Sequence, residues 1–225
     1  MPLERAWFAR PTIAVARDLV GCTLVVDAAT DAEVRAVLVE VEAYLGTADP
    51  ASHAYRGPTP RAAIMFGPAG HLYVYLSYGV HYCANVVTEA DGTGGAVLLR
   101  AASVVEGEPL VRQRRGRAGA IGPAAALLRG PGNLCQGLGI ALADNGTDVT
   151  SATARVELMA AVRRPPLSRG TRVGISVAAD ERLRFAWRGH PAVSRPLPWA
   201  KEKGPNKRAL DVLPSKRQPG GNSRA

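Results

Sequence analysis

Cysteine is scarce in this 225-residue sequence, and lysine is missing from its first 200 residues. The three cysteines, Cys22, Cys83 and Cys135, lie far apart, and none belongs to a C-x-x-C pair. This spacing excludes a disulfide framework and argues against a cysteine-rich zinc site. No uninterrupted apolar run approaches the roughly 20 residues that cross a bilayer, and the N-terminus shows no secretory signal. We therefore expect a cytoplasmic protein that does not span a membrane.

The missing lysines and the spacing of the four histidines exclude further classes. A G-x-x-x-x-G-K-[ST] loop is absent, which excludes nucleotide hydrolysis by a P-loop. The histidines form neither H-x-x-H nor H-E-x-x-H pairs, so the sequence does not favour metal catalysis. We expect no cofactor and no bound metal.

Positive charge is plentiful and unevenly distributed. Lysine and arginine number 28 against 19 acidic residues, a net charge of +9, of which residues 201–225 carry +5. Such a balance favours a polyanionic partner or an anionic membrane surface. The segment 201–225 is rich in proline, glycine and charge, which predicts a disordered tail. A solvating terminus is the favoured interpretation of this tail, and an electrostatic arm for nucleic acid is the alternative.

Apolar periodicity predicts one α+β domain over residues 1–200, built on a curved antiparallel sheet. Thr12 is expected to cap a helix that ends at Leu19, and residues 46–70 form a long loop. An arginine-rich surface loop, R-Q-R-R-G-R-A-G, interrupts a helical region over 105–129, and a short helix follows G-P-G-N within 130–140. The expected strands are residues 23–26, 34–41, a hairpin over 71–87, 96–103, 155–160, 173–177 and 183–187.

All six tyrosines fall between Tyr44 and Tyr82. On a strand, Tyr73 and Tyr75 share one face, while the alternate residues face an aliphatic core. The pattern by itself favours tyrosines that cover a sheet surface, and a platform for stacking bases is the alternative. Tyr78 differs because it is predicted at the hairpin tip, where a large ring has little core to join. It could act as a wedge between bases.

Glu40 and Glu42 occupy alternate positions of V-E-V-E-A-Y-L-G, so both face one side of a regular strand. Two such carboxylates are compatible with a surface pattern, a metal site or an acid/base pair whose proximity raises one pKa. For an arbitrary strand, exposed glutamates are the general expectation.

Several motifs in series carry a family resemblance. They are V-E-V-E-A-Y-L-G with a downstream A-S-H, then T-P-R, L-Y-V-Y-L-S-Y-G-V-H-Y-C-A-N, V-L-L-R-A and G-P-G-N-L-C-Q-G-L-G-I. In this order the sequence resembles the alkyladenine (3-methyladenine) DNA glycosylase family, bacterial members in particular, from about Ala16 to Ser194. The resemblance implies a single mixed domain around an open-barrel-like curved antiparallel sheet, with flanking helices and a protruding hairpin that enters the minor groove.

The resemblance also implies roles for individual residues. Glu42 is the implied catalytic carboxylate. Tyr44 and His53 line the pocket for a flipped base, Tyr75 stacks on that base from the other side, and Tyr78 intercalates into the DNA.

Three further roles come from the same resemblance. Asn85 guards the pocket against the amino group of guanine, and Arg100 helps to place the nucleophilic water. The backbone near Ala51 contacts the base.

The implied activity is that of a monofunctional DNA glycosylase in base excision repair. Such an enzyme flips alkylated or deaminated purines out of duplex DNA and hydrolyses the N-glycosidic bond, which leaves an abasic site. Strand cleavage needs an amine that forms a Schiff base, and residues 1–200 contain no lysine, so no lyase activity is expected. The expected partner is double-stranded DNA with damaged purines, and no membrane partner is expected. The protein is expected to act as a monomer that associates with the nucleoid through DNA.

Two alternatives from other classes stay open. A non-enzymatic protein that binds damaged DNA could keep both pocket and wedge. A glycoside hydrolase could use Glu40 and Glu42 as its paired carboxylates.

Overall fold

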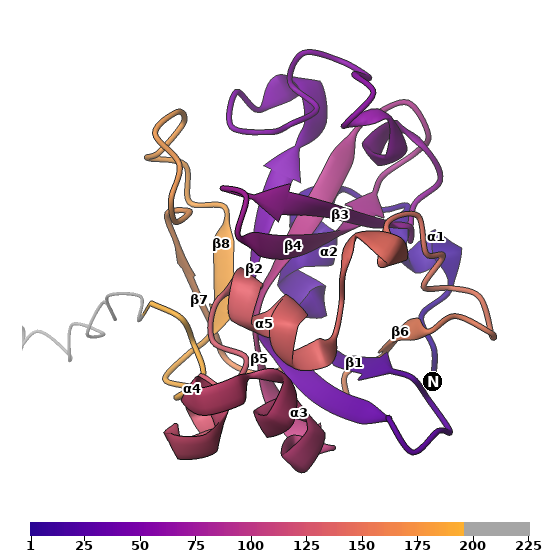
Figure 1. The fold of residues 1–225 in the computed structure, drawn as a ribbon. Helices are drawn as coiled ribbons and strands as arrows, with labels where there is room; N and C mark the ends of the chain where they lie inside the picture. Colours follow the sequence, from indigo (N-terminus) through magenta and orange to yellow (C-terminus); the bar gives the residue numbers. More distant parts are fainter. Residues whose placement is uncertain (196–225) are drawn as a thin grey trace, which may run out of the picture.

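Segments rich in valine and leucine build eight antiparallel strands within residues 1–195, the part of the chain that the computed structural model describes (Figure 1). The main path of the sheet runs β3-β4-β5-β2-β1-β6, and β8 pairs with β2 and with β7. The sheet curls into a half-barrel, which confirms the predicted α+β fold. The predicted tail, residues 201–225, lies outside the described residues. The strands are β1 (Thr23–Val26), β2 (Val34–Leu45), β3 (Leu72–Ser77), β4 (His81–Thr88), β5 (Gly95–Glu106), β6 (Val156–Met159), β7 (Leu167–Gly170) and β8 (Arg184–Trp187).

The long strand β2 changes its neighbour half-way along its length. Its beginning pairs with β1, and its stretch Glu40–Glu42 pairs with β8, while β5 runs along its other side. The register against β5 shifts on both sides of Glu40, and such bulges bend a strand and increase its twist. Strands pair with β2 on both edges at this point, and the side chains of Glu40 and Glu42 are fully buried.

Helices cover one face of the sheet and enclose the main hydrophobic core. Helix α2 (Thr12–Leu19) buries Val15, Ala16 and Leu19 and packs against β2 and β5, while α5 (Pro131–Leu138) packs against β4 and β5. The predicted Thr12–Leu19 helix is confirmed, but Thr12 is its first residue and does not cap it. The carboxylate of Glu89 accepts the Thr12 N–H at 2.9 Å, which satisfies an N–H that the helix itself leaves unpaired. The remaining helices are α1 (Arg5–Phe8), α3 (Glu108–Arg114) and α4 (Gly116–Ile121), with short 3-10 turns at Gly46–Ala48, Ala63–Phe66, Ala124–Ala126 and Leu142–Asp144.

Strands β3 and β4 form the predicted hairpin. Its turn has positive φ at both Tyr78 (49°) and Gly79 (69°), the combination found in tight hairpin turns. A bulky residue rarely adopts this backbone conformation, so Tyr78 is held at the tip in a strained position. Its side chain is 90% exposed, and Val80 beside it is also exposed. The sequence therefore places an aromatic ring where no packing in the described protein requires one.

Two predicted elements were wrong. The arginine-rich stretch is not a loop, because helices α3 and α4 contain most of it. Arg112 pairs with Glu108 one helical turn earlier at 2.7 Å, and Arg114 donates to the carbonyl of Leu138 at 3.0 Å. These arginines stabilise the helical region, and the predicted surface loop is not formed.

The expected strand at 173–177 is also wrong, since the chain there is irregular and the extra strand is β7. The backbone N–H of Val173 donates to the Glu42 carboxylate at 2.8 Å, and Gly174 has a φ of 79°. A donor that is used by a side chain and a left-handed residue are both incompatible with a regular ladder.

No helix within residues 1–195 has the length and apolar character needed to span a bilayer.

Candidate active site

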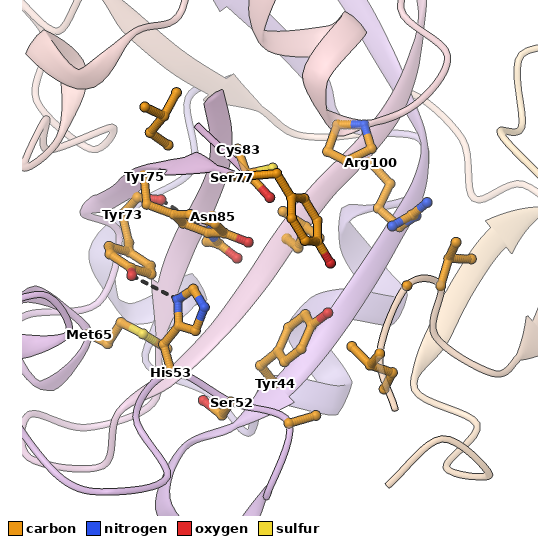
Figure 2. A pocket seen from close by; sticks show the side chains of 18 of the residues that line it. Tyr44, Ser52, His53, Met65, Tyr73, Tyr75, Ser77, Cys83, Asn85 and Arg100 are labelled. Carbon is orange, nitrogen blue, oxygen red and sulfur yellow. Dashed lines mark hydrogen bonds between the residues drawn. The ribbon is translucent and has the colours of Figure 1, made fainter. Parts of the chain in front are cut away.

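A cavity of about 490 Å³ opens at the base of the β3–β4 hairpin (Figure 2). It lies where the end of β2, the loop after β2, the hairpin, β5 and the segment around Val173 meet. Figure 2 shows His53, Tyr73 and Tyr75 on one side of this space and Tyr44 with Arg100 on another. Seven of the residues predicted from the sequence line the cavity: Tyr44, Ala51, His53, Tyr75, Tyr78, Asn85 and Arg100. The eighth, Glu42, lies immediately behind this lining.

Glu42 is completely buried and is held by three cavity-lining residues. Its Oε1 accepts the Val173 N–H at 2.8 Å and lies 3.3 Å from Nη1 of Arg100. Its Oε2 accepts the hydroxyl of Tyr44 at 3.1 Å. The carboxylate is therefore fixed at the base of the cavity, and one of its oxygens still has acceptor capacity.

Glu40 has a different environment from Glu42. It does not line the cavity, and its carboxylate accepts Nε of Arg100 at 3.1 Å and Nη1 of Arg184 at 2.9 Å. The N–H and the hydroxyl of Ser194 donate to it as well, at 2.5 and 2.9 Å. The expectation of exposed glutamates is wrong for both positions, because buried arginines compensate their charge. Glu40 is an internal anchor that holds Arg100, and Glu42 is the carboxylate beside the cavity.

The two carboxylates and Arg100 influence one another. Burial raises the pKa of Glu42 above its ordinary value, and the charge of Arg100, the Val173 N–H and the Tyr44 hydroxyl oppose that rise. Burial works against the charge of Arg100 too, but Glu42 and Glu40 outweigh it and raise the pKa of the guanidinium. Arg100 is consequently a permanent cation that promotes the ionised form of Glu42.

The cavity has aromatic walls, and the surroundings of His53 and Tyr44 define the protonation states of these side chains. Nδ1 of His53 and the hydroxyl of Tyr73 are 2.8 Å apart, and the Tyr73 and Tyr75 rings stack with centroids 5.3 Å apart. Burial, together with the nearby charge of Arg61, lowers the pKa of His53, so the imidazole is neutral at pH 7. Burial and Glu42 raise the pKa of Tyr44, which keeps its phenol protonated as a donor to Glu42. The walls can therefore stack on a flat ring and offer it neutral hydrogen-bonding groups.

Asn85 lies opposite Tyr73 in the β3–β4 pairing, and its amide nitrogen donates to the carbonyl of Tyr73 at 3.1 Å. This bond fixes the orientation of the amide where it lines the cavity. A fixed side chain can exclude a ligand group by contact, whereas a mobile one would move aside.

The sequence analysis missed several residues of the site. The backbone of Val173 was assigned to a strand, and Ser52 and Arg61 received no role, although all three line the cavity. Tyr73, which was predicted only to share a strand face with Tyr75, lines the cavity as well. The guanidinium of Arg61 lies 5.0 Å from the centre of the Tyr75 ring. The T-P-R motif was a usable signal for Arg61. No local pattern pointed to Val173, because its partner Glu42 is 131 positions away.

Neither a metal site nor a reactive cysteine is evident in the described residues. Within 1–195, no group of three or more histidine, cysteine, aspartate or glutamate side chains could hold a metal ion. The three cysteines are free and buried. Burial raises the pKa of Cys22 to about 11, which leaves it an unreactive thiol at neutral pH.

Comparisons with known proteins place the chain in a family. Residues 6–191 match the family model for methylpurine-DNA glycosylase. Three bacterial relatives are each named "Putative 3-methyladenine DNA glycosylase". The protein from Nitrobacter winogradskyi is 43% identical over 196 residues, which cover 87% of this chain and 88% of the relative. The one from Corynebacterium glutamicum is 44% identical and covers 90% of this chain and 100% of its own, and the one from Mycobacterium sp. (strain KMS) is 47% identical and covers 81% and 87%.

Proposed function

The chain belongs to the methylpurine-DNA glycosylase family and is a DNA glycosylase for alkylated bases, and from this premise we propose that it everts damaged purines from duplex DNA and hydrolyses their N-glycosidic bonds. The observation that carries the proposal is the position of Glu42. A buried carboxylate lies behind an aromatic cavity that is large enough for a base, and a permanent cation is in contact with it.

Base eversion is the first step in this proposal. A purine inside a duplex cannot reach the cavity, so the nucleotide must rotate out at a cost of about a few kcal/mol, which is smaller for a weakly paired lesion. Tyr78 fills the vacated position in the stack. The exposed ring on a strained turn supports this role, because the hairpin presents it outward before any DNA is bound.

Bond cleavage follows inside the cavity. As the glycosidic bond lengthens, positive charge develops on the sugar, and the fixed anion of Glu42 stabilises it. The free acceptor capacity of Glu42 takes a proton from water as the water attacks the sugar, and Arg100 orients that water. Alkylated purines that already carry positive charge leave without further protonation, and the aromatic walls attract them by about 0.5–2 kcal/mol.

We propose that the protein hydrolyses the N-glycosidic bond and does not cleave the DNA strand. A lyase step needs an amine near the sugar, and residues 1–200 contain no lysine. The N-terminal residue Met1 accepts a hydrogen bond from Ala160, just beyond β6, and β6 and β3 are at opposite ends of the sheet path. Met1 is not among the residues that line the cavity.

The test is a gel assay with labelled duplexes that carry one 7-methylguanine, ethenoadenine or hypoxanthine. We expect full-length strands before alkali treatment and breaks at the lesion after it, since alkali opens abasic sites. Breaks before alkali would contradict the monofunctional assignment. Tight binding without abasic sites would favour the non-enzymatic alternative.

Tyr78→Ala is expected to lower excision from duplex DNA about 5- to 150-fold, the equivalent of the roughly 1–3 kcal/mol that one stacked base contributes. Excision from single-stranded DNA should change little, because no stack needs filling there. The measurement is the single-turnover rate on the two substrates. Ile121→Ala removes an exposed apolar side chain from helix α4 and serves as the control. Equal losses on both substrates would refute the wedge.

A further inference from the structure

A buried ion pair lies behind the cavity and has no part in the proposed mechanism so far. Arg172 and Asp49 are the partners, with side-chain exposures of 0% and 2%. Nη2 of Arg172 donates to Oδ1 of Asp49 at 2.9 Å, and Nη1 contacts Oδ2, so the pair is bidentate. Nη1 also donates to the carbonyl of Ala43 at 3.1 Å, and Ala43 lies between Glu42 and Tyr44 on β2.

Asp49 shapes the loop that follows β2. Its Oδ2 accepts the N–H of Leu45 at 3.1 Å, and its Oδ1 accepts the N–H of Ala51 at 3.0 Å. Its carbonyl accepts the N–H of Ser52 at 2.9 Å. A single aspartate thus folds the chain back after β2 and sets the backbone of Ala51 and Ser52, two residues of the cavity wall.

Arg172 also contacts Tyr44, a further residue of the cavity wall. Its guanidinium carbon lies 4.7 Å from the centre of the Tyr44 ring. The Nε of Arg172 is buried and has no hydrogen-bond partner in the described residues. Tyr44 lines the cavity and Arg172 does not, which means that the cation holds the ring from its inner side. The next residue in the chain, Val173, donates its N–H to Glu42.

We propose that the Asp49–Arg172 pair is the positioning device of this active site. It joins the end of β2, the loop at Ala51 and the segment at Val173. It thereby fixes the Tyr44 ring and the Glu42 carboxylate in position relative to each other. The inference rests on the proposed function, because it assigns the pair to base stacking and to ionisation of the catalytic carboxylate.

A purely stabilising role does not account for the pair equally well. Burial of two charges costs desolvation free energy that their attraction offsets only in good geometry, and apolar residues of similar volume often stabilise a protein as much. Burial opposes the charge on Asp49, but Arg172 and two backbone N–H groups lower its pKa, so the carboxylate is ionised at neutral pH. Unlike an apolar contact, this pair supplies hydrogen-bond donors and acceptors in fixed positions. These groups hold the three segments named above around the cavity.

The test compares three variants with the wild type by single-turnover excision of 7-methylguanine across pH 5–8, with thermal unfolding in parallel. Arg172→Met removes the cation but keeps a long side chain, and Arg172→Lys keeps the charge without the bidentate geometry. Arg155→Met is the matched control. Arg155 makes a bidentate pair with Asp144 at 2.9 and 2.7 Å, and neither residue lines the cavity.

Arg172→Met is expected to lower the rate at pH 7 about 100-fold, the loss that a small misplacement of catalytic groups can cause. The acid limb of its pH profile should move to higher pH, because a displaced Val173 N–H no longer lowers the pKa of Glu42. Arg172→Lys should recover part of the rate and of the profile. Arg155→Met should lower the melting temperature while its rate per folded molecule and its acid limb match the wild type.

A rate and an acid limb unchanged in folded Arg172→Met would overturn the inference, as would equal losses in Arg172→Met and Arg155→Met. If Arg172→Met is unfolded at the assay temperature, Arg172→Lys and Asp49→Asn decide by the same two readouts. Wild-type protein that excises none of the lesions would overturn the proposed function instead. The proposal for the pair is then tested by the fluorescence emission of ethenoadenine in a bound duplex. Arg172→Met changes this emission if Tyr44 is displaced and leaves it unchanged if Tyr44 stays in place.

Discussion

Glu42→Gln is expected to lower single-turnover excision by at least about 10³-fold, from the combined loss of a fixed anion and of a general base. The fold should persist, because glutamine has the shape of glutamate and its amide oxygen can still accept the Val173 N–H. The amide also removes the burial cost that raises the pKa of the Glu42 carboxyl, so the melting temperature should not fall appreciably. The measurement pairs the excision rate on 7-methylguanine duplex with thermal unfolding and with duplex affinity, which should be retained.

Glu40→Gln is the contrasting variant at the same strand. Glu40 accepts four hydrogen bonds, from Arg100, from Arg184 and from both the N–H and the hydroxyl of Ser194. Neutralising Glu40 leaves the buried guanidinium of Arg184 without a carboxylate partner, a change that costs about 3–5 kcal/mol in comparable pairs, while Arg100 keeps Glu42. We expect lower stability with a smaller loss of excision per folded molecule. A reversed result, in which Glu40→Gln abolishes chemistry and Glu42→Gln does not, would transfer the catalytic role to Glu40.

The parts of the fold that the sequence predicted are those in which local pattern decides the structure. Partly alternating apolar residues predicted the strand 34–41, which is the first part of β2, and strand-like residues on either side of Gly79 predicted the hairpin and its tip. The cavity followed from these elements, since Tyr44, Tyr75 and Asn85 lie on adjoining parts of one sheet. Their roles came from resemblance to a family, because the pattern alone favoured tyrosines that cover a sheet surface.

The parts that could not be predicted depend on contacts between distant residues. Val173 contacts Glu42 across 131 positions, and Arg172 contacts Asp49 across 123. The apolar residues of segment 173–177 predict a strand from the sequence. The structure shows instead that the Val173 N–H donates to the Glu42 carboxylate. Burial of Glu40 and Glu42 was unexpected for the same reason, because the compensating charges come from β5 and β8.

Arg100→Gln is expected to shift the pH dependence of excision as well as its rate. Arg100 lowers the pKa of Glu42, whereas burial raises it. Removing the guanidinium therefore raises the pKa further, so that a smaller fraction of Glu42 is ionised at any pH below the new value. In the proposed mechanism the reactive form is the carboxylate, so the rate should fall most at low pH and recover as pH rises. Each pKa unit of displacement corresponds to about a tenfold loss on the acid limb.

The substrate for this measurement matters as much as the variant. 7-Methylguanine carries positive charge and leaves without protonation, so its acid limb reports Glu42 and not a proton donor. Between pH 5 and 8 we expect the Arg100→Gln limb at higher pH than that of the wild type, with Arg100→Lys between them because a lysine keeps the charge but not the planar contacts to two carboxylates. A loss by one constant factor at every pH would show that Arg100 orients water without influencing the ionisation of Glu42. An unchanged rate would remove Arg100 from the mechanism.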